Sequence, residues 1–325
     1  MRLAALLVAL ALTQAAATPP SPPEAREIAP DTFLVPGGML PNRGPDGNTV
    51  VFAGPDGLVV VDTGRHAWHS DGILAFARAR RQPIRAIVNT HWHLDHSSGN
   101  GRLKAAHPDA RVYTTRAVDR ALAPDGFLTR NAEMARGRTP EPTDPPTRAE
   151  ETAIFLATME AFDELRPDVP VEASGTMRLA GRPLSVRAAE DAVTDADLWL
   201  YDEATGVAVI GDLVTLPAPF FETACPAQWQ QALDAVWAMP FRLAVPGHGA
   251  PMTREGFDMY RGAFRAFRAC VGSEAESRAC ADAWTRDVGT LLKTDVDRRQ
   301  ATGFAAYYVD FLRTNGGASP DCRVK

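Results

Sequence analysis

Residues 91–96 form the motif H-x-H-x-D-H, which constrains this chain more than any other feature. Only 7 of the 325 residues are histidine, so multiplying residue frequencies gives such a motif in roughly a few chains per ten thousand. His91 and His93 lie two apart on an extended segment, so their side chains point the same way and can share one metal ion. Asp95 and His96, in the turn that follows, can face a second metal ion. The motif therefore predicts a metal site at the end of a strand.

Three other apolar runs end in a side chain of the kind that such a site uses. Residues 59–61 precede Asp62, residues 209–211 precede Asp212, and residues 245–247 precede His248. Carboxylates and imidazoles at the ends of several strands are what a metal site at the open edge of a sheet requires. The same edge is therefore expected to collect ligands from distant parts of the sequence.

The order of apolar runs and turn signals predicts an α/β fold, in which strands alternate with helices. Strands are expected at residues 33–35, 49–53, 58–61, 84–89, 184–188, 198–201, 207–210 and 243–245. Helices are expected at residues 71–81, 148–165 and 229–237, and from residue 253 onward. We predict a core domain at residues 31–252, with an insertion at about 114–170 that forms a lid or a wall facing the substrate. A helical extension at residues 253–325 follows.

The N-terminus has the pattern of a signal peptide, residues 1–17. Arg2 supplies a positive charge, residues 3–12 are apolar, and residues 15–17 are alanines. Ten apolar residues are far fewer than the ~20 that span a bilayer. We therefore predict a periplasmic or secreted protein without a membrane span in its mature form. A Pro-rich leader occupies residues 18–30.

The four cysteines are expected to form disulfides, because export places them in an oxidising compartment. Cys225, Cys270, Cys280 and Cys322 allow three connectivities. Cys270 and Cys280 are ten residues apart and are the easiest pair to close, which would leave Cys225 to pair with Cys322. Thiolate ligation of a metal would need closer spacing, such as C-x-x-C, which the sequence lacks.

Composition narrows the class of partner. The chain is 45% hydrophobic and 23% charged, with a net charge of −6, so collagen-like and disordered classes are excluded. No run of five basic residues occurs, which argues against a nucleic acid partner. A small-molecule substrate is expected instead, and the sequence leaves the oligomeric state open.

On these motifs the sequence resembles the metallo-β-lactamase fold metallohydrolase superfamily over residues 31–250. The H-x-H-x-D-H element carries most of the resemblance, and D-T-G, G-D and P-G-H-G follow in the family's order. The resemblance implies a four-layer αββα sandwich with a dinuclear zinc site at one sheet edge. Residues 216–226 and the tail that bears the cysteines also resemble exported zinc metallohydrolases associated with quinoprotein systems.

The resemblance also implies a role for each matching residue. The first metal would be held by His91 and His93, the second by Asp95, His96 and His248, with Asp212 as the bridge. Asp62 would orient a ligand histidine. Zinc is the expected cofactor, with one or two ions per chain.

One position departs from the family pattern. The family usually has a histidine four residues before the Asp that opens a strand, and here that position is Val193. Valine cannot bind zinc, so the first metal lacks one ligand and the second site is the more certain one. Five side chains are candidates to replace the missing ligand: Glu190, Asp191, Asp195, His66 and His69.

The reaction implied by the resemblance is zinc-dependent hydrolysis of an ester, thioester, lactone or β-lactam type carbonyl, with hydroxide supplied at neutral pH by the metal. Asp95 would orient the nucleophile and shuttle its proton. Two alternatives remain open. One is an iron-dependent sulfur-type oxygenase on the same fold, although the flavodiiron H-x-E arrangement is not present. The other is a non-catalytic metal-binding module, which the valine at position 193 would suit.

Overall fold

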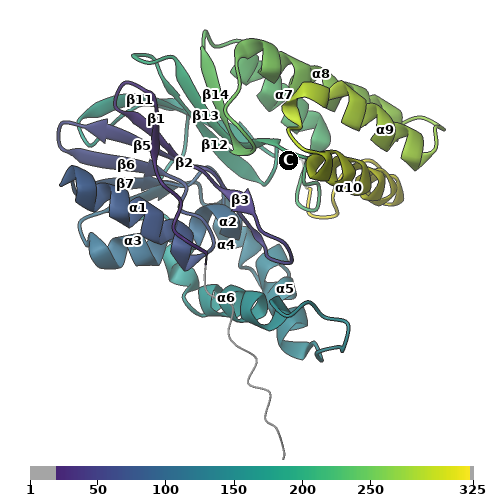
Figure 1. The fold of residues 1–325 in the computed structure, drawn as a ribbon, viewed down its shortest axis with the longest axis horizontal. Helices are drawn as coiled ribbons and strands as arrows, with labels where there is room; N and C mark the ends of the chain where they lie inside the picture. The colour runs from purple at the N-terminus through teal and green to yellow at the C-terminus, as the bar shows by residue number, and fades with distance from the viewer. Residues whose placement is uncertain (1–19, 323–325) are drawn as a thin grey trace, which may run out of the picture.

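The computed structural model describes residues 20–322, so the predicted signal peptide lies outside the described residues. Two β-sheets pack face to face and helices cover both outer faces, which is the expected αββα sandwich (Figure 1). The first sheet contains, in spatial order, β1 (Arg26–Ala29), β2 (Thr32–Val35), β5 (Thr49–Gly54), β6 (Gly57–Val61), β7 (Ile84–Val88), β8 (Arg111–Thr114) and β9 (Val169–Pro170). The second contains β10 (Gly175–Leu179), β11 (Arg182–Glu190), β12 (Ala196–Asp202), β13 (Val207–Thr215) and β14 (Leu243–His248).

Alternating side chains on β5 show how the sequence builds the layers. Val50 and Phe52 point into the apolar layer between the two sheets, where they meet residues of the second sheet such as Leu200. Val51 and Ala53 point the other way, toward the helices on the outer face. Successive strand residues face opposite sides, and β5 is apolar on both sides because both of its faces are covered.

Helices α1 (Ala67–Arg80) and α3 (Asn100–Ala106) cover the outer face of the first sheet. Ile73, Leu74 and Ala77 of α1 and Leu103 of α3 are buried there. Helix α1 begins four residues before the predicted residue 71. His69 and Ser70 in this first turn are buried polar residues, which the apolar pattern does not reveal.

The outer face of the second sheet is covered by α7 (Pro226–Trp237), α8 (Arg254–Val271), α9 (Ser277–Asp287) and α10 (Asp295–Thr314), with the short η2 (Gly289–Leu291) before α10. Trp229, Phe264, Trp284 and Val309, one from each helix, belong to one buried apolar cluster with Ala208 of the sheet. The predicted extension at 253–325 therefore shares the core of the sandwich rather than forming a separate unit.

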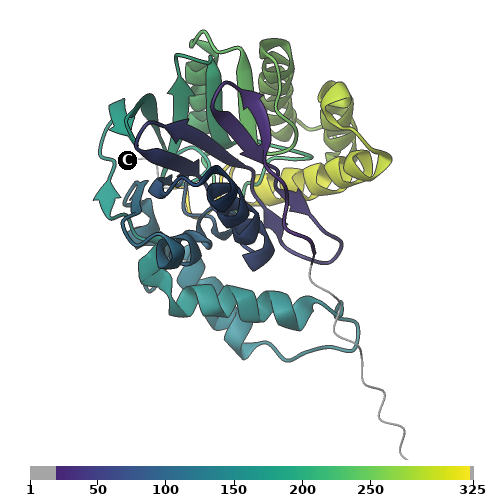
Figure 2. The ribbon, with the colours of Figure 1, turned by 60° about the vertical axis from the view of Figure 1, so that its left-hand side comes forward.

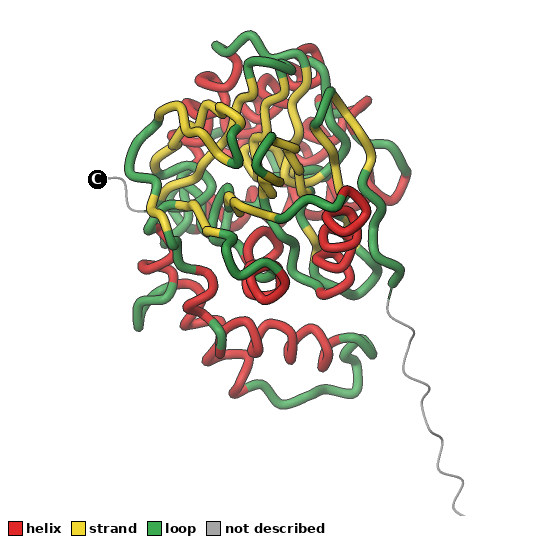
Figure 3. The backbone as a smooth tube through the Cα atoms, turned by 90° about the vertical axis from the view of Figure 1, so that its left-hand side faces the viewer, coloured by secondary structure: helices red, strands yellow, loops and turns green. Residues whose placement is uncertain are grey.

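The predicted insertion at 114–170 starts at the last residue of β8 and ends at the last residue of β9. It contains α4 (Ala117–Ala121), α5 (Phe127–Gly137), α6 (Arg148–Glu160) and the 3-10 helix η1 (Phe162–Leu165), where the sequence predicted one helix over 148–165. That helix ends at Glu160, and the chain turns at Ala161 before η1. Helices α5 and α6 lie to one side of the sandwich (Figures 1 and 3).

The Pro-rich leader also differs from the prediction, because residues 26–29 form β1 and pair with β2. The sheet thus begins before the predicted domain boundary at residue 31. The strands β8 and β10 were likewise not predicted. The eight predicted strand segments all coincide with observed strands, and the segment 84–89 overruns its strand by one residue.

Two disulfides occur, Cys270–Cys280 and Cys225–Cys322. The first joins α8 to α9, and the second joins the residue before α7 to the C-terminal tail. Within residues 20–322, no helix has the length and apolar character needed to cross a membrane.

Candidate metal centre

Six side chains from four places in the chain meet at one edge of the sandwich. His91 and His93 follow β7, Asp95 and His96 lie on the short helix α2 (Leu94–Ser97), Asp212 lies on β13, and His248 ends β14. They form two adjacent groups that could each hold a metal ion, His91–His93–Asp212 and Asp95–His96–His248. The six residues that the sequence assigned to a two-metal site are therefore brought together.

The second group is tightly gathered. His248 Nε2 lies 3.0 Å from Asp95 Oδ2 and 3.3 Å from His96 Nε2. Asp212 Oδ1 lies 3.1 Å from His96 Nε2 and 3.5 Å from His248 Nε2. Four ligand atoms thus face one small volume, which matches the number that zinc takes in tetrahedral sites.

Asp212 stands between the two groups, because its other oxygen, Oδ2, lies 3.7 Å from His91 Nε2. Both His91 Nε2 and Asp212 Oδ1 are buried without a hydrogen-bond partner. Buried polar atoms left without a partner are costly, so such orphans call for an explanation. A cation between them would satisfy both atoms, and the donor set therefore fits a metal ion.

Hydrogen bonds fix which nitrogen of His91 and of His96 is free for a metal. Asp62 accepts hydrogen bonds from the backbone N–H of Thr90 at 2.7 Å, from Thr90 Oγ1 at 2.8 Å and from His96 Nδ1 at 2.8 Å. Because the Thr90 hydroxyl donates to Asp62, it accepts from His91 Nδ1, 2.9 Å away. Both imidazoles therefore donate from Nδ1, and Nε2, which is turned toward Asp212, is the nitrogen left for a metal. Asp62 lies where the sequence analysis expected it, against a ligand histidine.

His93 is oriented from the opposite direction. Thr223 Oγ1 donates to the carbonyl oxygen of Val193 at 2.8 Å, so it accepts from His93 Nε2 at 3.0 Å. This bond leaves Nδ1 as the free nitrogen of His93. Thr223 was not found by sequence reasoning, because a threonine before a cysteine gives no signal of such a role.

The charges of the site favour a bound cation. Burial lowers the pKa of His93 to about 4 and holds the pKa of His91 well below its usual range, so both are neutral ligands at pH 7. For His96, burial opposes the charged form, but Asp212, Asp62 and Asp95 outweigh it and raise the pKa well above its usual value. These three carboxylates therefore stabilise a proton on His96. A metal ion bound at the same place would supply the positive charge instead.

Two glycines make room for the ligands. A Cβ atom on Gly247 would lie 1.9 Å from Asp212 Oδ1, and one on Gly47 would lie 2.3 Å from Cε1 of the His96 ring. Only residues without a side chain allow the backbone to approach this closely. The glycine before His248 in the P-G-H-G motif is thus needed for the geometry of the neighbouring ligand.

Val193 is buried, at 1% exposure, in the apolar cluster behind the second sheet. Its backbone N–H donates to Asp197 Oδ2 at 2.9 Å, and its carbonyl oxygen accepts from Thr223. The hydroxyl group of Thr223 therefore bridges the carbonyl oxygen of residue 193 and the ring of His93. The valine side chain itself offers no ligand atom.

The five candidates to replace the missing ligand lie elsewhere, and none belongs to either ligand group. His66 Nδ1 lies 2.8 Å from Asp46 and its Nε2 lies 3.1 Å from Glu151. His69 Nε2 lies 2.8 Å from Thr49 Oγ1. The remaining three follow or end β11: Glu190, which is exposed, and Asp191 and Asp195, which are half-buried.

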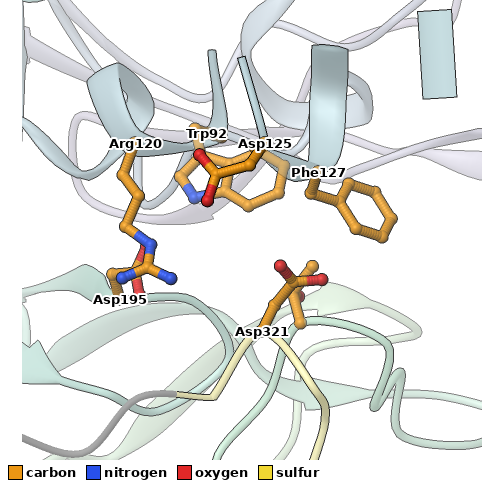
Figure 4. A pocket seen from close by; sticks show the side chains of 9 residues that line it. Trp92, Arg120, Asp125, Phe127, Asp195 and Asp321 are labelled. Atoms are coloured by element: carbon orange, nitrogen blue, oxygen red, sulfur yellow. The ribbon is translucent and has the colours of Figure 1, made fainter. Parts of the chain in front are cut away.

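Asp195 faces a small pocket of 220 Å³ beside the first group (Figure 4). Its carboxylate lies 3.4 Å from Arg120, and in the figure the two side chains face each other at one side of the pocket. Asp125 and Asp321 also line this pocket, as does Thr223. The carboxylate of Asp195 is thus committed to an ion pair outside the metal centre.

A larger groove of 1420 Å³ opens over the centre. Its floor includes His93, Asp95, Asp212 and His248. Its walls come from the hairpin of β3 (Gly38–Met39) and β4 (Pro45–Asp46), the segment 215–222 after β13, Phe127 and α10. The centre is therefore reachable by a molecule much larger than water.

The fold and the site define a class of protein: an αββα sandwich with a two-part His/Asp centre at one edge of its sheets. The model of the metallo-beta-lactamase superfamily matches residues 43–248, and this chain belongs to that superfamily. Members of the superfamily are mostly hydrolases.

Individual relatives are distant. The linear primary-alkylsulfatase of Pseudomonas sp. (strain ATCC 19151) is 25% identical over 227 residues, which is 61% of this chain and 40% of the alkylsulfatase. The chain thus spans about two fifths of that relative's length. The solved structure of a metallo-beta-lactamase from Hirschia baltica covers 73% of this chain and 95% of its own, at 18% identity and a TM-score of 0.51. A metallo-beta-lactamase family protein from Thermus thermophilus covers 88% and 94%, at 18% identity and a TM-score of 0.57. These structures establish the fold.

The missing ligand leads to a first prediction. Because the resemblance to the superfamily places a histidine ligand at position 193, Val193→His is expected to add one bound zinc ion per chain. The larger ring costs about 1–3 kcal/mol of stability by overpacking. Val193→Leu, which adds volume without a nitrogen, is the matched control and should leave the zinc content unchanged. Equal zinc content in the two variants, measured by elemental mass spectrometry, would contradict the prediction.

A second prediction concerns His69 and pH. Burial lowers the pKa of His69 to about 4 from an ordinary value of 6.5, so the folded protein resists protonating it and the unfolded chain does not. Stability should therefore fall as pH drops from 6.5 toward 4, by about 3 kcal/mol from this residue. His69→Gln should flatten that part of the profile when urea midpoints of the metal-free protein are compared. Parallel profiles for the two proteins would show that His69 does not contribute.

Proposed function

We propose that this protein is an exported, zinc-dependent hydrolase that acts on an ester, thioester, lactone or β-lactam type carbonyl. The observation that carries the proposal is the pair of ligand groups joined by Asp212, with two buried orphan atoms, His91 Nε2 and Asp212 Oδ1, and an open groove whose floor includes Asp212. The two disulfides support export, because such bonds persist in oxidising compartments.

In this proposal His96, His248, Asp95 and Asp212 would hold one metal ion, and His91 and His93, with Asp212, would hold a weaker second one. A bound zinc ion supplies Lewis acidity, which lowers the pKa of water toward neutrality and polarises a carbonyl group. The proton acceptor in the reaction is a side chain of the protein itself.

Asp95 is the proposed catalytic residue. One of its oxygens lies 3.0 Å from His248 Nε2, and the residue lines the groove, so its carboxylate can accept a proton from water at the floor. Its pKa lies well below its usual range, because His96 and His248 outweigh the effect of burial. Asp95 is therefore a carboxylate at neutral pH.

The first experiment is the metal content of disulfide-intact protein purified without chelator, by elemental mass spectrometry. One zinc ion per chain supports the proposal with the second site filled, and two support it with both filled. Iron in place of zinc would favour an oxygenase instead. No metal after addition of zinc would refute the proposal.

Turnover separates a hydrolase from a metal-binding module. Chromogenic esters, thioesters, lactones and a β-lactam are tested with the zinc-loaded protein, with dodecyl sulfate added because one relative is named an alkylsulfatase. Hydrolysis that is lost with a chelator and restored with zinc supports the proposal. A protein that binds zinc and hydrolyses none of them would be a binding module.

A further inference from the structure

Exposed apolar side chains concentrate in the groove above the metal centre. Eight large apolar residues are exposed among the described residues, and five of them line this groove. These five are Met39, Leu40, Val296, Phe304 and Tyr307, with exposures of 40–51%. Scattered apolar residues on a surface need no explanation, whereas a contiguous apolar surface marks a site of interaction.

Two separate elements supply these residues. Met39 and Leu40 come from the β3–β4 hairpin, and Val296, Phe304 and Tyr307 come from α10. The hairpin and α10 lie near each other in the ribbon (Figures 1 and 2), and both line the groove. Leu216 and Phe220 of the segment after β13 continue the apolar lining toward the floor, where Phe220 packs edge-on against His93 at 5.3 Å between ring centres. An apolar path therefore runs from the outer surface to a proposed metal ligand.

The hairpin wall is held in place by α6 of the insertion. Arg43 pairs with Glu150 at 2.7 Å and with Glu151 at 3.1 Å, and Glu151 also accepts from the backbone N–H of Gly44 at 2.8 Å. His66 adds a contact of 3.1 Å to Glu151. The wall is thus a fixed surface whose charged groups are already paired among themselves.

Arg65 is different, because it is a half-buried cation in the groove with no side-chain partner among residues 20–322. Its Nε atom is buried without a hydrogen bond, and the residue lines the groove together with Asp95. Its guanidinium lies against Gly44, where a Cβ atom would come within 2.0 Å of Nη1. A glycine thus makes room for the guanidinium, which can offer its donors to an anion.

We propose that the groove binds an anionic amphiphile, with its hydrocarbon chain between the β3–β4 hairpin and α10 and its negative group on Arg65. The binding part of this inference does not depend on the proposed function. Only the kind of bond that is cleaved rests on it. It names the substrate class as an ester with an apolar chain and a carboxylate or a similar anion near the scissile group.

Binding of three small probes to the zinc-loaded protein tests the proposal by calorimetry: octanoate, butanoate and octan-1-ol. Octanoate should bind at least about 10-fold more tightly than butanoate, within the ~200-fold limit for full burial of four methylene groups. It should also bind more tightly than octan-1-ol, which lacks the charge. Equal affinity for octanoate and butanoate would overturn the proposal.

Two pairs of variants assign the contacts. Phe304→Gln should weaken octanoate by about 5-fold and leave butanoate unchanged, because one wall of the chain site loses apolar surface. Met134→Gln is the matched control, since Met134 is also exposed on a helix but lies outside the groove. Equal effects of the two substitutions would place the chain elsewhere.

Arg65→Gln should abolish the preference for octanoate over octan-1-ol, and Arg65→Lys should retain part of it. If octanoate affinity is insensitive to Arg65→Gln, its carboxylate is held by the metal, and the assignment to Arg65 is wrong. Binding is read without turnover. A protein that binds octanoate as expected but hydrolyses no ester therefore refutes the proposed function and leaves this inference standing.

Discussion

His248→Ala is expected to remove the tightly bound metal ion. His248 Nε2 is one of four ligand atoms around the second position, and its loss leaves Asp95 without its 3.0 Å partner. Outer-shell substitutions already cost about 10–100-fold in metal affinity, so loss of a direct ligand should exceed that range. Zinc content per chain should fall to near zero after dialysis, and hydrolysis should fall with it.

His91→Ala is the matched comparison. In the proposed assignment His91 contributes to the first position, where Val193 stands in place of a third histidine, so this variant should keep most of the tightly bound zinc. If His91→Ala loses as much zinc as His248→Ala, the two positions do not differ in strength. Circular dichroism of both variants checks that the fold is retained.

Asp62→Ala is expected to have the second large effect, on both stability and metal binding. Asp62 is buried and accepts hydrogen bonds from Thr90 N, Thr90 Oγ1 and His96 Nδ1. Removing the acceptor leaves these three donors buried and unpaired, which should cost about 3–5 kcal/mol of stability. Zinc affinity should fall by about 10–100-fold, because His96 is no longer oriented.

Asp62→Asn separates the two effects. The amide keeps the shape and one acceptor oxygen, so it should retain more stability than alanine, while its NH2 group cannot accept from His96. Urea unfolding and zinc titration are measured on both variants. Unchanged zinc affinity in both would show that Asp62 is a structural residue without influence on the ligand.

The candidate ligands could be predicted from two features of the sequence: their close spacing in the H-x-H-x-D-H motif, and their position directly after apolar runs. Two histidines two apart on an extended segment must point the same way, and strands of one sheet end at a shared edge. Asp212 and His248 lie on strands of the second sheet, whereas His91 follows a strand of the first, so it was the resemblance to the superfamily that grouped them before the structure did. Short apolar runs bounded by turn signals predicted the strands.

The partners that orient the ligands were not predictable. Thr223 reaches His93 across 130 positions of sequence, and Arg65 gains its position from Gly44, so neither has a local pattern. The five proposed substitutes for Val193 are not among the residues of the two ligand groups, and His66, for one, lies between the Asp46 and Glu151 carboxylates. Short sequence distance to a motif says little about which way a side chain turns.

The Cys225–Cys322 disulfide has a consequence for the order of assembly. It fastens the tail to the segment that carries Thr223, and Ser319 adds hydrogen bonds to the carbonyl oxygens of Glu222 at 2.6 Å and of Ala224 at 3.2 Å. A chain still emerging from a ribosome or a translocation channel has every candidate ligand before it has this clamp. The segment that orients His93 is therefore fastened only after residue 322 has arrived and an oxidant has closed the bond.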